Sequence, residues 1–309
     1  MEMKATRVAY GEALKRLGEE NDKIVVFDAD VGNATYTQTF QKAFPERFYQ
    51  MGIAEANMVC AAAGIADMDF IPFVSAFAVF GIGRAYDQVR NTVAYGNCNV
   101  KLAMTHGGLT GGPDGGSHQA IEDIALTRVL PNVRVLCPCD ATAVYPALRA
   151  AAEFEGPVYI RLSRMATEVY GERPFQFGGS NVMREGADAV VFTCGIMVSQ
   201  CLHAAELLAA KGIELAVVDL YSIKPVDEAR IREYAAKCGV VFTAEEHSIY
   251  GGLGDAVACV LESEGKYPMH RIGVQDRFGT SADPEVIIAE YGLDAAGVAE
   301  TIEKTLRAD

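Results

Sequence analysis

The amino-acid sequence predicts an α/β protein with two domains, each built on a parallel sheet covered by helices. Short apolar runs alternate with helical segments along the chain, which is the pattern of a doubly wound sheet. The 309 residues are too many for one ordinary hydrophobic core. A polar stretch containing Gly and Pro separates two such series. We therefore expect domains over 1–170 and 187–309, joined by a linker over 171–186.

The first series starts with an amphipathic helix over 7–20, in which Leu14 and Leu17 are among the apolar positions. Apolar runs that end in polar loops predict buried parallel strands. Open α/β sheets bind ligands at the edge where those strands end. Helices are expected after Glu55 and over 84–94. The expected strands are 24–27, 48–51, 71–77, 100–106, 133–136 and 158–162.

The second series repeats the pattern beyond the linker. Glycines at 251, 252 and 254 precede a further helix, but they lack the G-x-G-x-x-G spacing of a dinucleotide loop and are only a weak signal. The expected strands are 189–193, 215–219 and 240–244, and the expected helices are 198–210 and 227–237.

Composition and charge argue against several classes of function. The chain has 27 Lys and Arg against 41 Asp and Glu, a net charge of −14, and no basic block, so we expect no nucleic-acid binding. No apolar run reaches the roughly 18–20 residues of a membrane span, so we expect no membrane association. The first residues lack the apolar core of a signal peptide, which favours a cytoplasmic location. The eight Cys are expected to be mostly buried, reduced thiols.

The first stretch with candidate chemistry is 52–58, which reads Gly-Ile-Ala-Glu-Ala-Asn-Met. Glu55 stands at the entrance to a run of small and apolar residues that carries no other charge for eleven residues. A carboxylate in a first helical turn is favoured by the helix dipole, so Glu55 is either a helix-start residue or a working acid.

The second stretch is a loop over 105–119 that contains six Gly, two His and one Asp. It follows a predicted buried strand, where functional side chains concentrate. A flexible surface loop is the alternative, and a His/Asp metal site lacks a convincing third ligand. In the third stretch, Phe77 and Phe80 are either core residues or a stacking surface for a flat heteroaromatic ring.

These motifs, in this order and at these spacings, resemble the transketolase family over the whole chain. The resemblance is closest to the stand-alone C-terminal subunit of split, two-chain transketolases. It implies a pyrimidine-binding domain of the thiamine diphosphate fold followed by a smaller α/β transketolase C-terminal domain. The motifs are Gly-Ile-Ala-Glu-x-Asn-Met (52–58), Phe-x-x-Phe with Arg-x-Tyr-Asp-Gln (77–88), Thr-His-x-Gly-Leu-x-x-Gly-x-Asp-Gly-x-Ser-His-Gln (105–119), Pro-Cys-Asp (138–140) and Leu-Ser-Arg (162–164).

The resemblance implies a cofactor site for thiamine diphosphate. Glu55 matches the glutamate that hydrogen-bonds N1′ of the aminopyrimidine, which makes it a catalytic residue as well as a cofactor ligand. Phe80 matches the aromatic residue that stacks on the pyrimidine, and Phe77 lines the same pocket. Asp30 aligns with an acidic residue near the cofactor.

The resemblance also implies a site for sugar phosphates. His118 and His106 match histidines near the substrate hydroxyls and the reacting carbonyl, and His118 is the better candidate for proton transfer. Asp114 matches an aspartate that contacts a donor-sugar hydroxyl. Arg7 and Arg164 match arginines that hold the sugar phosphate, a role that suits the geometry of a guanidinium group.

Three departures from the family pattern stand out. The family often has Tyr where this chain has Gly83, and often Glu where it has Pro113. These differences bear on the details of the pyrimidine pocket and on the shape of the loop. The phosphate-contacting Ser of the Asp30 loop has no clear match, because this loop reads Asn-Ala-Thr over 33–35.

A metal motif is missing. The family holds Mg²⁺ and the diphosphate with Gly-Asp-Gly and a later Asn, whereas this chain has no Gly-Asp-Gly and no Asn after Asn181. We therefore expect no metal ligand in this chain, and expect the Mg²⁺ ligands on an N-terminal partner subunit. The two chains are expected to form an α2β2 assembly that is active only as a pair.

The leading interpretation is a transferase that moves a two-carbon ketol group from a ketose phosphate to an aldose phosphate. A β subunit of a 2-oxo acid dehydrogenase has similar domains, but the double-His loop and Leu-Ser-Arg argue against it. A 1-deoxyxylulose-5-phosphate synthase normally carries its own metal motif. An accessory subunit with a degenerate pocket and an enzyme for an unusual sugar phosphate are the remaining alternatives.

Overall fold

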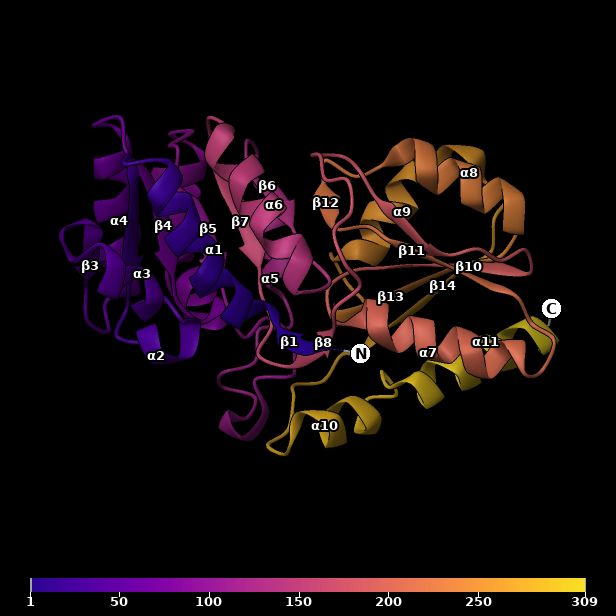
Figure 1. Ribbon diagram of the computed structural model, residues 1–309. Helices are drawn as coiled ribbons and strands as arrows, with labels where there is room; N and C mark the ends of the chain where they lie inside the picture. The colour runs from indigo at the N-terminus through magenta and orange to yellow at the C-terminus, as the bar shows by residue number, and fades with distance from the viewer. Residues whose placement is uncertain (1, 309) are drawn as a thin grey trace.

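The computed structural model describes residues 2–308, which form two lobes side by side (Figure 1). The first lobe holds a seven-stranded sheet with the order β12-β6-β7-β5-β4-β2-β3. Its strands are parallel except β12, which runs antiparallel to β6. The bounds are β2 (Ile24–Asp28), β3 (Phe48–Gln50), β4 (Ile71–Ser75), β5 (Lys101–Met104), β6 (Arg134–Leu136), β7 (Val158–Arg161) and β12 (Ser222–Lys224).

Helices cover both faces of this sheet because its strands are apolar on both sides. In β2, Ile24 and Val26 pack into a core with α1 and α6, whereas Val25 and Phe27 pack into a core with α4. The segment expected to be an ordinary helix over 84–94 begins earlier and winds in wide π-type turns, η2 and η3. The bounds are α1 (Thr6–Glu20), α2 (Gly32–Thr35), α3 (Gln38–Ala43), α4 (Glu55–Ala66), η2 (Val79–Arg84), η3 (Gln88–Ala94), α5 (Asp123–Arg128) and α6 (Ala141–Glu153).

The second lobe holds a five-stranded sheet with the order β14-β13-β10-β11-β9, in which only β9 is antiparallel. Helices α8 and α9 cover one face, and α7 and α11 cover the other (Figure 1). The bounds are β9 (Asn181–Arg184), β10 (Ala189–Thr193), β11 (Leu215–Asp219), β13 (Val241–Ser248), β14 (Met269–Val274), α7 (Met197–Ala209), α8 (Glu228–Cys238), α9 (Leu253–Leu261), α10 (Pro284–Glu290) and α11 (Ala295–Ala308).

The predicted two-domain, parallel-sheet architecture is confirmed, but the chain links the two lobes more closely than the sequence suggested. Strand β9 lies inside the segment 171–186 and belongs to the second sheet, so that segment is more than a linker. Strand β12 comes from the second half of the chain and extends the first sheet. One hydrophobic core contains Val135 of the first lobe together with Val190 and Ile223.

The carboxyl ends of the parallel strands β2, β4, β5 and β7 lie at one edge of the first sheet. The loops that leave this edge carry most of the candidate residues, since Phe77 follows β4, His106 follows β5 and Arg164 follows β7. This is the edge at which open α/β sheets bind ligands. In the described part of the chain, no helix has both the length and the apolar character needed to cross a membrane.

Candidate active site

Glu55 is the first residue of α4, after a turn in which Gly52 has a φ of 68°, a backbone conformation that favours glycine. Its side chain is buried, with 4% exposed, although its carboxylate remains in contact with one half-exposed neighbour. Arg84 Nη1 donates to both carboxylate oxygens, at 3.1 and 3.0 Å. The carboxylate is therefore a buried hydrogen-bond acceptor at the start of a helix, where the dipole stabilises negative charge.

Two phenylalanine rings lie beside this carboxylate. Phe77 follows β4 and Phe80 belongs to η2, and their rings stack with a centroid separation of 6.2 Å. The guanidinium carbon of Arg84 lies 4.4 Å from the centre of the Phe80 ring. Both rings are half-buried, so they are not closed core residues. Arg84 thus links an aromatic face to a carboxylate acceptor, which is the pair of features that a flat heteroaromatic ring with N–H donors requires.

The two histidines of the Gly-rich loop reach the same rings. The His106 ring lies 3.9 Å from the Phe77 centroid, and the His118 ring meets Phe80 edge-on at 5.0 Å. His106 has a φ of 58°, which turns the chain sharply at the end of β5. The structure thus places His106 against Phe77, and His118 against Phe80 with Phe77 at 6.3 Å.

His106 is a neutral imidazole at neutral pH. Burial, reinforced by the positive charges of Arg7 and Arg164, lowers its pKa to about 3. Arg7 Nη1 lies 3.5 Å from its Nε2, and Thr105 Oγ1 lies 2.8 Å from its Nδ1. A guanidinium group can only donate, so Nε2 is the acceptor and Nδ1 carries the proton that is donated to Thr105.

The remaining charged residues form the outer side of the site. Arg164 Nη1 donates to Asp114 Oδ2 at 3.1 Å and to the carbonyl of Gly111 at 2.6 Å, which ties it to the loop. Arg7 donates to the carbonyl of Ala34 at 3.0 Å, and its buried Nε has no hydrogen-bond partner in the described chain. Two guanidinium groups with donor capacity left over are suited to an anionic group.

Asp30 is the predicted residue that these contacts do not reach. It is exposed with a φ of 65°, and its backbone N–H donates to Gln50 Oε1 at 2.7 Å. Its neighbour Asp28 is fully buried and accepts from the hydroxyls of Thr35 and Thr37 at 2.9 and 2.8 Å. Asp28 therefore shapes the loop after β2. This role of Asp28 was not predicted, because the sequence pattern of a carboxylate at the end of an apolar run is the same whether the carboxylate binds a ligand or its own loop.

A second missed residue is Glu246, which comes from β13 in the other lobe. Its Oε1 accepts the backbone N–H of Thr110 at 2.6 Å, and its side chain has 2% of its surface exposed. A Cβ at Gly108, whose φ is 86°, would lie 2.2 Å from the Glu246 carboxyl carbon. The glycine there allows the backbone of the histidine loop to approach this carboxylate. The only sequence signal was the acidic pair at 245–246 within an apolar run.

Replacement of Glu246 by Gln is expected to flatten the pH dependence of stability. Burial raises the pKa of Glu246 to about 7, although Arg161 and the Thr110 N–H favour its charged form. A carboxyl group with a raised pKa binds more protons in the folded state. Its stabilising contribution is therefore complete below the unfolded value near 4.5 and is lost as pH rises through 7.

Urea unfolding followed by circular dichroism at pH values from 4.5 to 8 measures this effect. The native chain should lose about 3 kcal/mol more than the Glu246→Gln variant across that range. Asp219, whose pKa burial also raises to about 7, is present in both proteins and cancels in the comparison. Parallel pH profiles for the two proteins would contradict the prediction.

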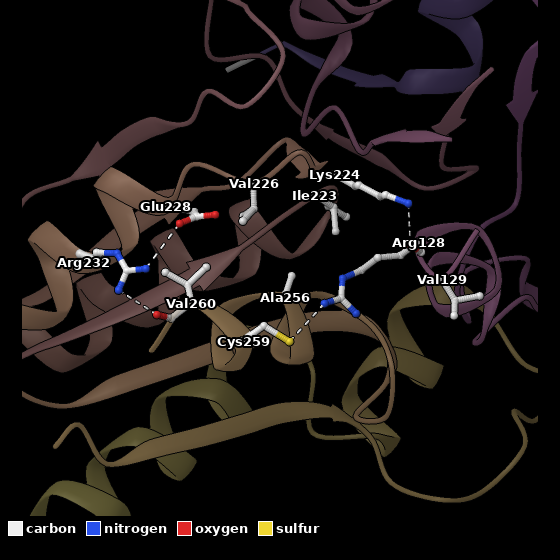
Figure 2. A pocket seen from close by; sticks show the side chains of 10 residues that line it. All are labelled: Arg128, Val129, Ile223, Lys224, Val226, Glu228, Arg232, Ala256, Cys259 and Val260. Carbon is white, nitrogen blue, oxygen red and sulfur yellow. Dashed lines mark hydrogen bonds and ion pairs between the residues drawn. The ribbon is translucent and has the colours of Figure 1, made fainter. Parts of the chain in front are cut away.

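Neither a cluster of metal ligands nor a role for the grooves elsewhere on the surface emerges from the part of the chain that the structure describes. Within residues 2–308, no group of three or more His, Cys, Asp or Glu side chains is arranged to hold a metal ion. One groove, with a volume of about 450 Å³, lies between α5, β12, α8 and α9. Figure 2 shows its lining side chains, which include none of the candidate residues. Its cations are already engaged, because Lys224 Nζ donates to the carbonyls of Arg128 and Leu130, and Arg232 pairs with Glu228 and Glu264.

The fold and the site together define a two-domain α/β protein whose first domain presents a buried carboxylate, two stacked aromatic rings and a histidine loop at the carboxyl edge of its sheet. Residues 2–169 match the transketolase pyrimidine-binding domain, and residues 178–298 match the transketolase C-terminal domain. The chain belongs to the transketolase family.

Several relatives match along nearly their full length. A protein from Methanocaldococcus jannaschii named as a transketolase C-terminal section is 41% identical, with 98% of this chain and 97% of that protein covered. A 6-deoxy-6-sulfo-D-fructose transketolase subunit from a Clostridium species is 38% identical over 94% of this chain and 90% of that subunit. A solved structure titled a split-gene transketolase, inactive β4 tetramer, is 48% identical, covers 98% of both chains and superposes with a TM-score of 0.91.

The family implies thiamine diphosphate dependence, and the residues present fit one end of that cofactor. The planar Arg84 guanidinium lies against Phe80 and donates to Glu55, which demonstrates that a flat N–H donor is accommodated between them. The Gly-Asp-Gly motif, which the resemblance associates with the metal-bound diphosphate, does not occur in the sequence.

Proposed function

We propose that this chain is the C-terminal subunit of a two-chain transketolase that moves a two-carbon ketol group from a ketose phosphate to an aldose phosphate. The observation that carries the proposal is the buried Glu55 carboxylate, which Arg84 links to Phe80, with His106 against Phe77 and His118 against Phe80. Thiamine diphosphate, when bound, supplies the nucleophilic carbon and the electron sink for this transfer.

The residues of this chain have distinct tasks in the proposal. Glu55 holds the pyrimidine through a hydrogen bond at N1′, and Phe80 fixes the plane of the ring by stacking. His118 exchanges a proton with a substrate oxygen, while neutral His106 offers its Nε2 as an acceptor for a substrate hydroxyl. Asp114 accepts a hydrogen bond from a hydroxyl of the donor sugar.

The anionic end of the sugar is assigned to Arg7 and Arg164. The Nε of Arg7 has no partner in the described chain, and Arg164 is only partly occupied by Asp114 and Gly111. Guanidinium groups bind phosphate and sulfonate oxygens by the same geometry. A relative is named for a sulfonated sugar, so we include sulfonated donors among the candidate substrates.

The proposal includes a partner and an assembly. The sequence has no Gly-Asp-Gly and no Asn after Asn181, so the Mg²⁺ ligands and the diphosphate cradle are assigned to an N-terminal subunit, with two copies of each chain in an α2β2 complex. The solved relative that contains only the β-type chain is titled inactive, which supports the need for a second chain.

The test is to co-purify this chain with its N-terminal partner and assay a panel of ketose donors with thiamine diphosphate and Mg²⁺. Two-carbon transfer from a phosphorylated or sulfonated ketose by the pair, and none by this chain alone, is the expected result. Decarboxylation of a 2-oxo acid with an artificial electron acceptor, without ketol transfer, would instead identify a dehydrogenase β subunit. Ketol transfer by this chain alone would refute the requirement for a partner subunit.

Replacement of Arg164 by Ala is expected to raise KM for phosphorylated donors by about 10- to 100-fold, because one charge-assisted contact to the anion is lost. Steady-state kinetics of the assembled pair with matched phosphorylated and unphosphorylated ketoses provide the measurement. Arg164→Lys serves as the control that retains the charge and should lose less. Equal losses on both classes of ketose would show that Arg164 acts through Asp114 and the loop rather than on the anion.

A further inference from the structure

Arg84 occupies both groups that the proposed function assigns to the cofactor pyrimidine. Its Nη1 donates to both oxygens of Glu55, at 3.1 and 3.0 Å, and its guanidinium carbon lies 4.4 Å from the centre of the Phe80 ring. No other side chain in the described chain donates a hydrogen bond to the Glu55 carboxylate.

A guanidinium group resembles an aminopyrimidine in the features that this site can recognise. It is planar and delocalised, it presents N–H donors at its edge, and its face stacks on an aromatic ring. Glu55 can accept from one such edge at a time, and the exposed face of Phe80 can carry one such plane. Arg84 and a bound pyrimidine therefore compete for the same acceptor and the same ring.

The two side chains differ in burial, and this difference indicates which of them moves when the contact breaks. The Glu55 side chain is 4% exposed, whereas the Arg84 side chain is 51% exposed. A buried carboxylate without a partner is unfavourable, so Arg84 stabilises the site before the cofactor arrives. Because Arg84 is half-exposed, moving its side chain into solvent has a small cost in free energy. There is open space beside this turn, since a Cβ at the preceding Gly83 would meet nothing within 4 Å.

We propose that Arg84 is an internal placeholder for the aminopyrimidine: it pairs with Glu55 and covers Phe80 in the cofactor-free protein, and it swings outward when thiamine diphosphate binds. This inference rests on the proposed function of the site. Arg84 would then affect cofactor affinity without being a cofactor ligand itself. In the cofactor-free state, Glu55 would be paired with Arg84 and the site would be ordered.

The test measures cofactor binding directly in the purified complex of both chains. Isothermal titration with thiamine diphosphate and Mg²⁺ gives Kd for the native complex, for Arg84→Gln and for Arg90→Gln. Arg90 is a matched control, because it is an exposed arginine of η3 whose side chain hydrogen-bonds to the neighbouring Asn91. Removing the competitor should lower Kd by about 5- to 30-fold in Arg84→Gln and leave Arg90→Gln unchanged.

Thermal unfolding of the same complexes provides a second measurement that a merely structural role would not reproduce. The Arg84→Gln complex should melt lower than the native complex without cofactor and match it when the cofactor saturates both. An unchanged or higher Kd in Arg84→Gln overturns the placeholder. A native complex that binds no thiamine diphosphate overturns the proposed function together with it, so the two failures are distinguishable.

Discussion

Replacement of Glu55 by Gln is expected to lower kcat of the assembled enzyme by about 10²- to 10⁴-fold, the usual contribution of a positioned acid–base group. The carboxylate is 4% exposed and starts α4, so an isosteric amide fits the same space. The amide is a weaker acceptor than the carboxylate, and it cannot carry the negative charge that holds a protonated ring nitrogen. The fold and the association with the partner should therefore persist while turnover is lost.

The competing explanation for Glu55 predicts a different result. If the carboxylate only favours the start of a helix, its replacement by Gln removes about 0.3–1 kcal/mol of stability and leaves kcat unchanged. Steady-state kinetics at saturating cofactor, together with size-exclusion chromatography of the complex, separate the two explanations. Native-like turnover in an intact Glu55→Gln complex would contradict a catalytic role.

Local patterns in the sequence predicted the elements whose stability is local. The strand β2 was predicted from a continuous apolar run, and it is buried on both faces as expected. The helix α4 was predicted from small and apolar residues after Glu55. The resemblance to transketolases implied that Phe77, Phe80, His106 and His118 share one site, and the structure places His106 against Phe77 and His118 against Phe80.

Features that depend on contacts between the two lobes were not predicted from the sequence. Strand β12 is three residues long and pairs with β6, more than eighty positions earlier in the chain. Glu246 determines the shape of the loop around Gly108 through the Thr110 amide, although it lies on another sheet. A local pattern cannot predict such contacts, because the same residues would suit a surface loop or an ordinary apolar strand.

The position of the Arg84 side chain was not predicted, for a different reason. Arg84 belongs to the motif Arg-x-Tyr-Asp-Gln, from which no role for the arginine was predicted. An ordinary helix was expected from 84, whereas η2 begins at Val79 and winds in π-type turns. The rotation of each residue around a helix depends on the type of turn, so the direction in which Arg84 points was not predictable. The structure directs it back onto Phe80 and Glu55.

Replacement of Asp123 by Asn is expected to reduce the free energy of unfolding by about 3–5 kcal/mol, because it leaves a buried arginine without its counter-charge. Arg161, which is 6% exposed, donates to the two oxygens of Asp123 at 2.7 and 3.2 Å. Burial opposes ionisation of Asp123, but the positive charge of Arg161 outweighs it and lowers the pKa of this carboxyl. The asparagine NH2 group would face an arginine that can only donate.

Arg161 of this ion pair also connects the first lobe to the second. Arg161 lies at the end of β7 and Asp123 at the start of α5, and the same guanidinium donates to the carbonyl of Glu246 in the second sheet at 2.9 Å. Disturbing Arg161 therefore weakens the support of the histidine loop as well as the first core. Urea unfolding monitored by circular dichroism should show a lower midpoint for the Asp123→Asn variant.

A double replacement separates the charge effect from packing. Asp123→Leu combined with Arg161→Met removes both charges at similar volume, so no unpaired charge remains buried, and it should recover most of the stability that Asp123→Asn loses. Unfolding of the native chain, Asp123→Asn and the double variant under one set of conditions completes the comparison.

Two outcomes would contradict the prediction. A decrease of less than about 1 kcal/mol in the free energy of unfolding of Asp123→Asn would show that the buried pair is solvated or replaceable, since exposed ion pairs contribute in that range. A double variant less stable than Asp123→Asn would show that the hydrogen bonds of Arg161 to Ala120 and Glu246 matter more than its charge.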